Sequence, residues 1–315
     1  APVMLVIDQL EGSAGNADVQ PFGNTLFSDV LTRITTPAPC SPESPCGTVF
    51  ADVGRRNEET HWKESMSQLD TIRQQAILAS LAGFSFLLVM GLDAEHAFLP
   101  ALLEAARNPK ILQAAQGYID CSVYVSPLQV PVRIDRTFGD QHPMGNPHYN
   151  LDPVAGKAMA QAIADGLTRN YPAHEATFKN NLGTYLTKLD AAIVQWQRDA
   201  APLRGVKLVS YHPDMIYLAA RFGMEAVGTI ELRAGIAPTP GHVATLEESM
   251  RREGVQLVVR ELYYPANLAE TIAQRTGAKM VELPAMVGGV PEAQDYLSFI
   301  DYNIRTLLKA IQGGS

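Results

Sequence analysis

Short apolar runs alternate with helical patterns along most of this chain, and this alternation constrains its fold more than any other feature. We expect strands at residues 3–7, 84–90, 122–132, 206–210, 226–230, 255–259 and 278–283. Helical spacing falls between them, at residues 68–82, 93–106, 153–169, 215–222, 245–253 and 293–311. Alternation of this kind predicts parallel sheets that are covered by helices on both faces.

One segment, residues 173–198, departs from the alternation and is predicted to be a single long helix. Its apolar stripe recurs every three or four residues, at Phe178, Leu182, Tyr185, Leu189, Ile193 and Trp196. A helix of about 26 residues would be roughly 39 Å long. We expect an α/β protein with two Rossmann-like lobes, residues 1–172 and 200–315, joined by a rigid helix at 173–199. The alternative is an ordinary long helix within one domain.

The balance of charges excludes one large class of partner. The chain has 25 Lys and Arg against 33 Asp and Glu, a formal net charge of −8. Without a basic excess, nucleic acid is not expected as the main partner. No apolar run reaches the ~20 residues that span a bilayer. Phosphate-binding loops, nucleophile elbows and HExxH motifs are also absent from the sequence, which argues against nucleotide-dependent and hydrolytic chemistry.

The N-terminal region carries two hints about the compartment. The chain begins Ala1-Pro2 without an initiator Met, as a mature chain does after removal of a signal peptide. A sequence cut from a longer protein at this point would look the same. Cys40 and Cys46 flank a short proline-rich loop that a disulfide would close. Such a bridge implies an oxidising compartment such as the periplasm, and the alternative is reduced thiols in a cytosolic protein.

A Gly/Pro-rich loop at residues 139–153 holds two histidines, His142 and His148, directly before a predicted helix. Pro147 stiffens the backbone next to His148, and Asp152 is expected to cap the helix that starts at Pro153. A stiff loop can hold an imidazole in place for a metal ion. The plainer interpretation is a proline-bent turn with histidines facing solvent.

Three further polar residues follow predicted strands in the second half of the chain. They are His212 after the strand at 206–210, Glu231 after that at 226–230, and Glu261 after that at 255–259. Open α/β sheets bind ligands at the carboxyl ends of their strands. We therefore expect these side chains to gather near one ion.

The motifs around these residues occur together in one known family. They are NPHYNLDP at residues 146–153, YHPDMIYLAARFGM at 211–224, VRELYY at 259–264 with TGAK at 276–279, VGGVP at 287–291 and DYN at 301–303. In this order they resemble the TroA-like family, the zinc- and manganese-binding periplasmic solute-binding proteins of ABC transporters. The resemblance covers roughly residues 84–312, and the long helix from residue 173 matches the interlobe helix of that family.

The resemblance implies a metal site built from His61, His148, His212 and an acidic residue. His61 holds the place of the first histidine of the family, with a surface residue as the alternative. Many members have an aspartate after the last strand, but residues 283–289 contain no carboxylate. Glu261 is then the best acidic candidate, either as a ligand or as a group that orients a histidine. His142 and Glu231 are auxiliary candidates.

The function that this resemblance implies is binding and transport, without catalysis. The protein would capture Zn2+ first, or Mn2+ second, between two lobes outside the cytoplasm, and deliver it as a monomer to an ABC permease. One alternative is a metal-dependent hydrolase, with three ligands, a bound water and Glu261 as the base. Another alternative is a relative that binds a siderophore or corrinoid.

Overall fold

The computed structural model describes residues 3–6, 48–50, 84–96, 98–133, 142–233 and 236–313, and the side chains from residue 84 onward. The strands are β1 (Val3–Val6), β2 (Thr48–Phe50), β3 (Phe84–Val89), β4 (Tyr118–Asp120), β5 (Lys207–Ser210), β6 (Glu225–Thr229), β7 (Leu257–Glu261) and β8 (Lys279–Leu283). The helices are α4 (Leu99–Ala106), α5 (Pro153–Asn170), α6 (Glu175–Asp199), α7 (Ile216–Phe222), α8 (Pro240–Glu253), α9 (Ala266–Thr276) and α10 (Tyr296–Gln312). Three short 3-10 helices are η2 (Tyr149–Leu151), η3 (Pro172–His174) and η4 (Ala201–Leu203).

The strands form two four-stranded sheets, each entirely parallel, as the alternating pattern predicts. The strand orders are β2-β1-β3-β4 and β6-β5-β7-β8. The chain divides into two compact units, residues 1–126 with 155–189 and residues 127–154 with 190–315. Helices α5 and α6 contribute residues to both. The lobe boundaries expected from the sequence, 1–172, 173–199 and 200–315, stay a prediction.

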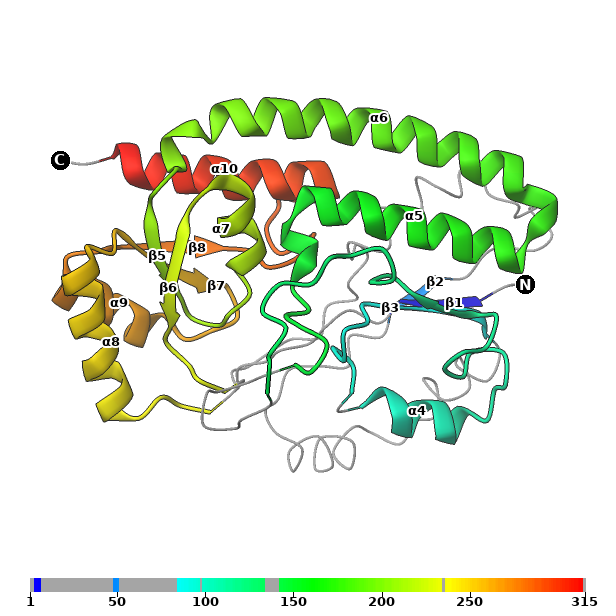
Figure 1. The fold of residues 1–315 in the computed structure, drawn as a ribbon, viewed down its shortest axis with the longest axis horizontal. Coiled ribbons are helices and arrows are strands. Elements are labelled where there is room, and N and C mark those ends of the chain that lie inside the picture. The colour runs from blue at the N-terminus through cyan, green and yellow to red at the C-terminus, as the bar shows by residue number, and fades with distance from the viewer. Residues whose placement is uncertain are drawn as a thin grey trace. The chain divides into compact units, whose positions relative to one another are not determined.

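In the first unit, the sheet has helices on both faces (Figure 1). Phe84, Leu87 and Val89 of β3 pack with Leu102 and Leu103 of α4 in one buried cluster. On the other face, Gly166 of α5 lies so close to Ile119 of β4 that an added Cβ would come within 2.5 Å of that side chain. Glycine at residue 166 therefore lets the helix approach the sheet.

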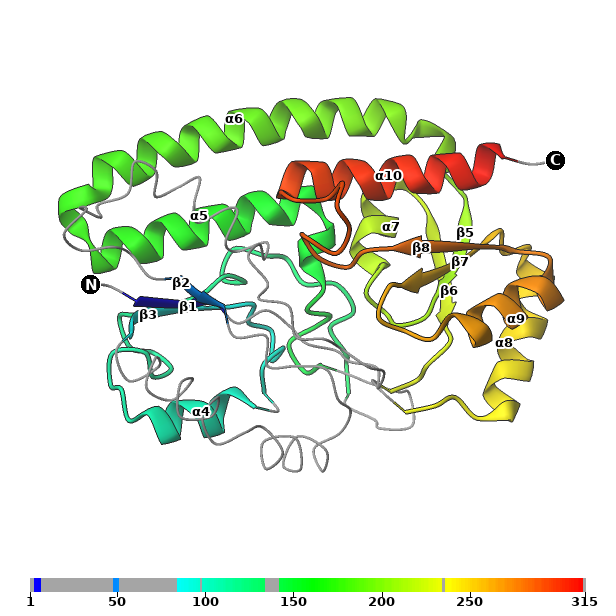
Figure 2. The same ribbon diagram turned by 180° about the vertical axis from the view of Figure 1, so that it is seen from behind.

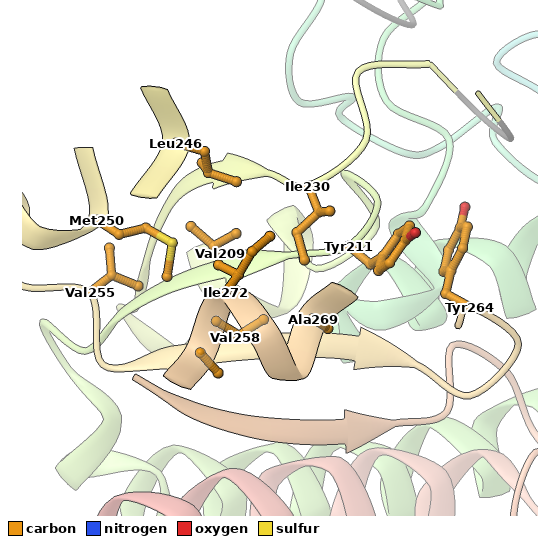
Figure 3. Close-up of a cluster of buried hydrophobic side chains, with 11 residues drawn as sticks. Val209, Tyr211, Ile230, Leu246, Met250, Val255, Val258, Tyr264, Ala269 and Ile272 are labelled. Carbon is orange, nitrogen blue, oxygen red and sulfur yellow. The ribbon is translucent and has the colours of Figure 1, made fainter. Parts of the chain in front are cut away.

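In the second unit, α7 and α10 lie on one side of the sheet and α8 and α9 on the other (Figures 1 and 2). A buried cluster joins the sheet to α8 and α9 (Figure 3), and includes Val209, Val258, Leu246, Met250 and Ile272. The helix ends follow local sequence signals. Thr239 caps α8 through the amide of His242, and Gly254 ends it with a φ of 69° that suits glycine.

Two predicted elements differ from the structure. Residues 122–132 were expected to be extended, but they open with a turn, because the Asp120 carboxylate accepts hydrogen bonds from the Ser122 amide and hydroxyl. The helix expected at 93–106 begins only at Leu99, since residues 92–96 form turns in which Leu92 and Asp93 have positive φ angles. In both cases a local turn takes precedence over the hydrophobic pattern.

The long helix predicted at 173–198 is confirmed as α6, a helix of 25 residues that follows η3. Its stripe is buried, including Phe178, Leu182, Leu189 and Trp196. Within the described part of the chain, none of the helices combines the length and apolar character that crossing a membrane requires.

Candidate metal centre

The carboxyl ends of three neighbouring strands bring the predicted residues of the second half together. His212 and Glu231 each follow their strands, β5 and β6, by two positions, and Glu261 is the last residue of β7. The segments after β5 and β6 are held by equivalent hydrogen bonds from the last residue of each strand. Ser210 Oγ donates to the His212 carbonyl at 2.5 Å, and Thr229 Oγ1 donates to the Glu231 carbonyl at 2.7 Å. The parallel order β6-β5-β7 therefore places these residues at one edge of the sheet.

The His212 ring is held by a buried carboxylate. Its Nδ1 lies 2.8 Å from Oε1 of Glu231, and the Tyr264 hydroxyl donates to the same oxygen at 2.5 Å. His212 and Glu231 are 1% and 2% exposed. Because an ionised carboxylate only accepts hydrogen bonds, Nδ1 carries the proton and Nε2 is the nitrogen that would coordinate a metal.

Tyr264 is fixed in turn by ring stacking. Its ring lies 4.2 Å from that of Tyr211 at an interplanar angle of 12°. Both tyrosines belong to the apolar cluster of the second unit. They lie at its end nearest the carboxyl ends of the strands (Figure 3). The apolar core of the unit thus extends to the group that orients His212.

The ring of His148 is also held at Nδ1, as that of His212 is, but by a neutral amide in place of a carboxylate. Its Nδ1 lies 2.8 Å from Oδ1 of Asn146, and its backbone amide donates to that oxygen at 2.9 Å. The side chain is 8% exposed, so it does not face bulk solvent as the plainer interpretation of the loop supposed. The two histidine rings lie 5.0 Å apart, centroid to centroid, at an interplanar angle of 72°.

This separation fits two imidazoles on one metal ion. With a metal–nitrogen distance of about 2.0–2.1 Å and a tetrahedral angle, two rings bound through Nε2 would have centroids about 5 Å apart. Among the residues whose side chains the structure describes, no group of three or more His, Cys, Asp or Glu side chains is arranged to hold a metal. The geometry of the described residues is therefore that of two imidazoles close enough to share one ion.

Asp214, two residues after His212, and Glu261, the last residue of β7, form a close pair of buried carboxyl groups, both 0% exposed. Burial, together with the nearby charge of Asp214, raises the pKa of Glu261 well above its ordinary value. No N–H donor of the described residues reaches the Glu261 oxygens.

His142 shares a pocket with His148 and His212, the two histidines whose rings lie 5.0 Å apart and which we call the ring pair. The pocket has a volume of about 360 Å³, and its lining includes His142, His148, His212 and Asn146. Glu231 and Glu261 are not among the residues that line it. The polar wall of this pocket consists mainly of imidazole and amide groups.

The structure thus brings together His142, His148, His212 and Glu231, and places Glu261 at the end of β7. His61, Cys40 and Cys46 lie outside the described residues, so their predicted roles stay predictions. Sequence reasoning missed Asn146, Asp214 and Tyr264. For Asn146 a signal was present, because an Asn two residues before a histidine commonly bonds to that residue's backbone amide.

A comparison of the sequence with family models identifies the family of this chain. The model of the family described as "Zinc-uptake complex component A periplasmic", ZnuA, matches residues 73–310. The chain belongs to the ZnuA family. The match includes β3 to β8 and both histidines of the ring pair.

Curated relatives of this family are distant and align over part of their length. The high-affinity zinc uptake system protein ZnuA of Brucella abortus (strain 2308) is 26% identical over 162 residues, 51% of this chain and 48% of the relative. The zinc-binding protein AdcA of Streptococcus pyogenes serotype M6 is 24% identical over 166 residues, 51% of this chain and 32% of the relative. This chain therefore spans about half or less of the length of these relatives.

Solved structures show the same fold over nearly the whole chain. A crystal structure of ZnuA matches with a TM-score of 0.70 at 19% identity, covering 98% of this chain and 99% of the other. FpvC from Pseudomonas aeruginosa, solved in complex with Mn2+, matches with a TM-score of 0.70 at 17% identity, covering 99% and 98%. At these identities the likeness establishes the fold alone.

Proposed function

We propose that this protein captures one divalent transition metal ion outside the cytoplasm and delivers it to an ABC permease. The observation that carries the proposal is the buried pair of His148 and His212, whose rings lie 5.0 Å apart and are each held at Nδ1. Such a pair presents Nε2 of both rings to a metal, and imidazole nitrogen is a preferred zinc ligand. Membership of the ZnuA family supports the same function.

Zn2+ is the cargo that the donor set favours, with Mn2+ second. Two imidazoles suit zinc better than manganese, which prefers oxygen ligands. The relatives agree with this order, since ZnuA and AdcA are named for zinc, while FpvC was solved with Mn2+. We propose that His61 supplies a further nitrogen ligand, and that His142 is an auxiliary ligand from the pocket wall.

Of the two roles expected for Glu261, we propose the supporting one. A fully buried carboxyl group whose pKa is raised beside Asp214 is a poor metal ligand, because a ligating carboxylate must be ionised. Asp214 lies two residues after His212, so the acid pair supports the segment that carries the histidine. Glu231 is proposed to orient His212 through Nδ1, and not to bind the ion itself.

The proposed chemistry is ligand exchange, with no covalent bond made or broken. Metal capture requires both imidazoles to be deprotonated at Nε2, so affinity should fall as the pH drops through the histidine range. The comparisons give no support to the hydrolase alternative. A monomeric state and an extracytoplasmic location are parts of this proposal.

Metal analysis of the native protein tests the proposal. Protein purified without a chelator or a histidine tag, then analysed by native mass spectrometry and elemental analysis, should carry one zinc per chain. Zinc-loaded protein should show no turnover of ester or phosphate substrates. Failure to retain or bind zinc or manganese would overturn the proposal, and sustained turnover would favour the hydrolase.

A further inference from the structure

Asn146 is the residue through which the two histidines of the ring pair are connected. It is 6% exposed and lies in the loop of His148, two positions before the histidine. Its amide nitrogen Nδ2 is 2.6 Å from the carbonyl oxygen of Pro213, the residue after His212. One side chain thus bonds to the segments of both candidate ligands.

The bonding partners fix how the amide of Asn146 is turned. The backbone N–H of His148 can only donate, so the atom 2.9 Å from it is the amide oxygen. The carbonyl of Pro213 can only accept, so the atom facing it is the amide nitrogen. Nδ2 also donates to Oε1 of Gln129 at 3.0 Å. The two backbone contacts give the same orientation independently.

This orientation decides the tautomer of His148. The ring nitrogen Nδ1 lies 2.8 Å from the amide oxygen, which can only accept a hydrogen bond. Nδ1 therefore carries the proton, and the lone pair of the neutral ring is on Nε2. In His212, the tautomer is set by Glu231, which lies at the same ring nitrogen.

The backbone of Asn146 is anchored as firmly as its side chain. Its amide donates to the Leu128 carbonyl at 2.8 Å, and its carbonyl accepts from the Tyr217 hydroxyl at 2.7 Å. Tyr217 belongs to α7, the helix that follows His212. The loop of His148 and the segment of His212 are therefore held as one structure around this residue.

We propose that Asn146 is a positioning residue that sets the tautomer of His148 and the spacing of His148 from His212, and thereby the strength and geometry of metal binding. The proposal rests on the metal-binding function proposed above. It assigns Asn146 no direct contact with the ion. The residue acts through the ring nitrogen of one histidine and the backbone next to the other.

The chain offers a matched control in Asn150. This residue lies in the same loop, is 8% exposed, and donates from its amide to the carbonyl of Ala285 at 2.9 Å. Asn150→Ala removes a comparable buried amide bond without touching either ring. It reports what a general loosening of the loop does to metal binding.

Two readouts separate this inference from the proposed function. In metal-free protein, ¹⁵N NMR of the imidazoles should show His148 protonated at Nδ1 in the wild type, in Asn150→Ala and in Asn146→Asp, whose carboxylate still accepts. Asn146→Ala should lose this preference. A wild-type His148 protonated at Nε2, or an unchanged tautomer in Asn146→Ala, would overturn the inference whether or not the protein binds metal.

The second readout is metal binding. Zn2+ affinity should fall about 10–100-fold in Asn146→Ala, the usual cost of losing a group that orients a ligand, and stay within about twofold in Asn150→Ala. The Co2+ absorption spectrum should change in Asn146→Asp, which cannot donate to the Pro213 carbonyl. Equal zinc affinities in the two alanine variants, or a wild-type cobalt spectrum in Asn146→Asp, would contradict the positioning role.

Discussion

Single residues decide which nitrogen each histidine presents, and the two histidines differ in the partner that decides it. His148 is paired with the neutral amide of Asn146, whereas His212 is paired with the carboxylate of Glu231, which also accepts from Tyr264. A carboxylate partner raises the basicity of a ligating imidazole more than an amide does. We therefore expect His212 to be the stronger donor to the metal.

Replacing Glu231 tests this difference. Glu231→Gln keeps the shape and one acceptor but removes the charge, so zinc affinity should fall about 10–100-fold. Tyr264→Phe, which keeps the charge and removes only one hydrogen bond to it, should cost less. Competition with a chromophoric chelator measures both. Wild-type zinc affinity in Glu231→Gln would show that the charge of Glu231 is unimportant for binding.

The buried Glu261 gives stability a defined pH dependence. Because its folded-state pKa is raised, the folded protein holds this proton more tightly than the unfolded chain. The stabilisation is complete below the ordinary value of 4.5 and is lost as the pH rises toward the folded-state pKa. Glu261→Gln, which is neutral at every pH, should gain stability relative to the wild type as the pH rises above 4.5.

Urea unfolding of metal-free protein at several pH values checks this prediction. The difference in unfolding free energy, Glu261→Gln minus wild type, should rise with pH. A difference that falls with pH would show that Glu261 is ionised in the folded protein, as a metal-binding carboxylate would be.

At the scale of elements, the start of α5 is tied to α7 by one acidic residue. The Asp152 carboxylate accepts from the amide of Val154, as a helix cap does, and from two nitrogens of Arg221 at 2.6 and 2.7 Å. Nearby, the Tyr296 hydroxyl of α10 donates to the Asn150 carbonyl at 3.0 Å. These contacts fasten the loop of His148 to the helices of the second unit.

Removing Asp152 should therefore cost more stability than removing its partner. Asp152→Ala loses both the cap and the ion pair, with an expected drop in unfolding free energy of about 1–3 kcal/mol. Arg221→Met keeps the cap and most of the apolar stem, and should cost less than about 1 kcal/mol. Equal losses in urea unfolding would mean that the cap contributes nothing.

The elements themselves were largely predictable from the sequence, while their contacts were not. The apolar runs of β3, β5 and β7 are short and mostly buried, so composition alone indicates strands. The turn after β4 escaped prediction because it depends on a side-chain bond from Asp120. Hydrogen bonds of this kind compete locally with the hydrophobic pattern.

At the scale of the whole molecule, the order of strands explains how distant residues meet. Because neighbouring parallel strands end at one edge, His212, Glu231 and Glu261 were predictable as neighbours from their places after strands. The contacts of Asn146 with Pro213 and of Tyr264 with Glu231 join residues 67 and 33 positions apart. Such pairings depend on the packed structure, and no local pattern encodes them.

The central claim is that His148 and His212 bind one metal ion together, and zinc titration of single variants tests it most directly. Wild-type protein should bind one Zn2+, and His148→Ala and His212→Ala should each lose more than about 100-fold in affinity, beyond the cost of losing an orienting group. His174→Ala, in η3, serves as the control and should bind as the wild type does. Wild-type affinity in His212→Ala would contradict the account.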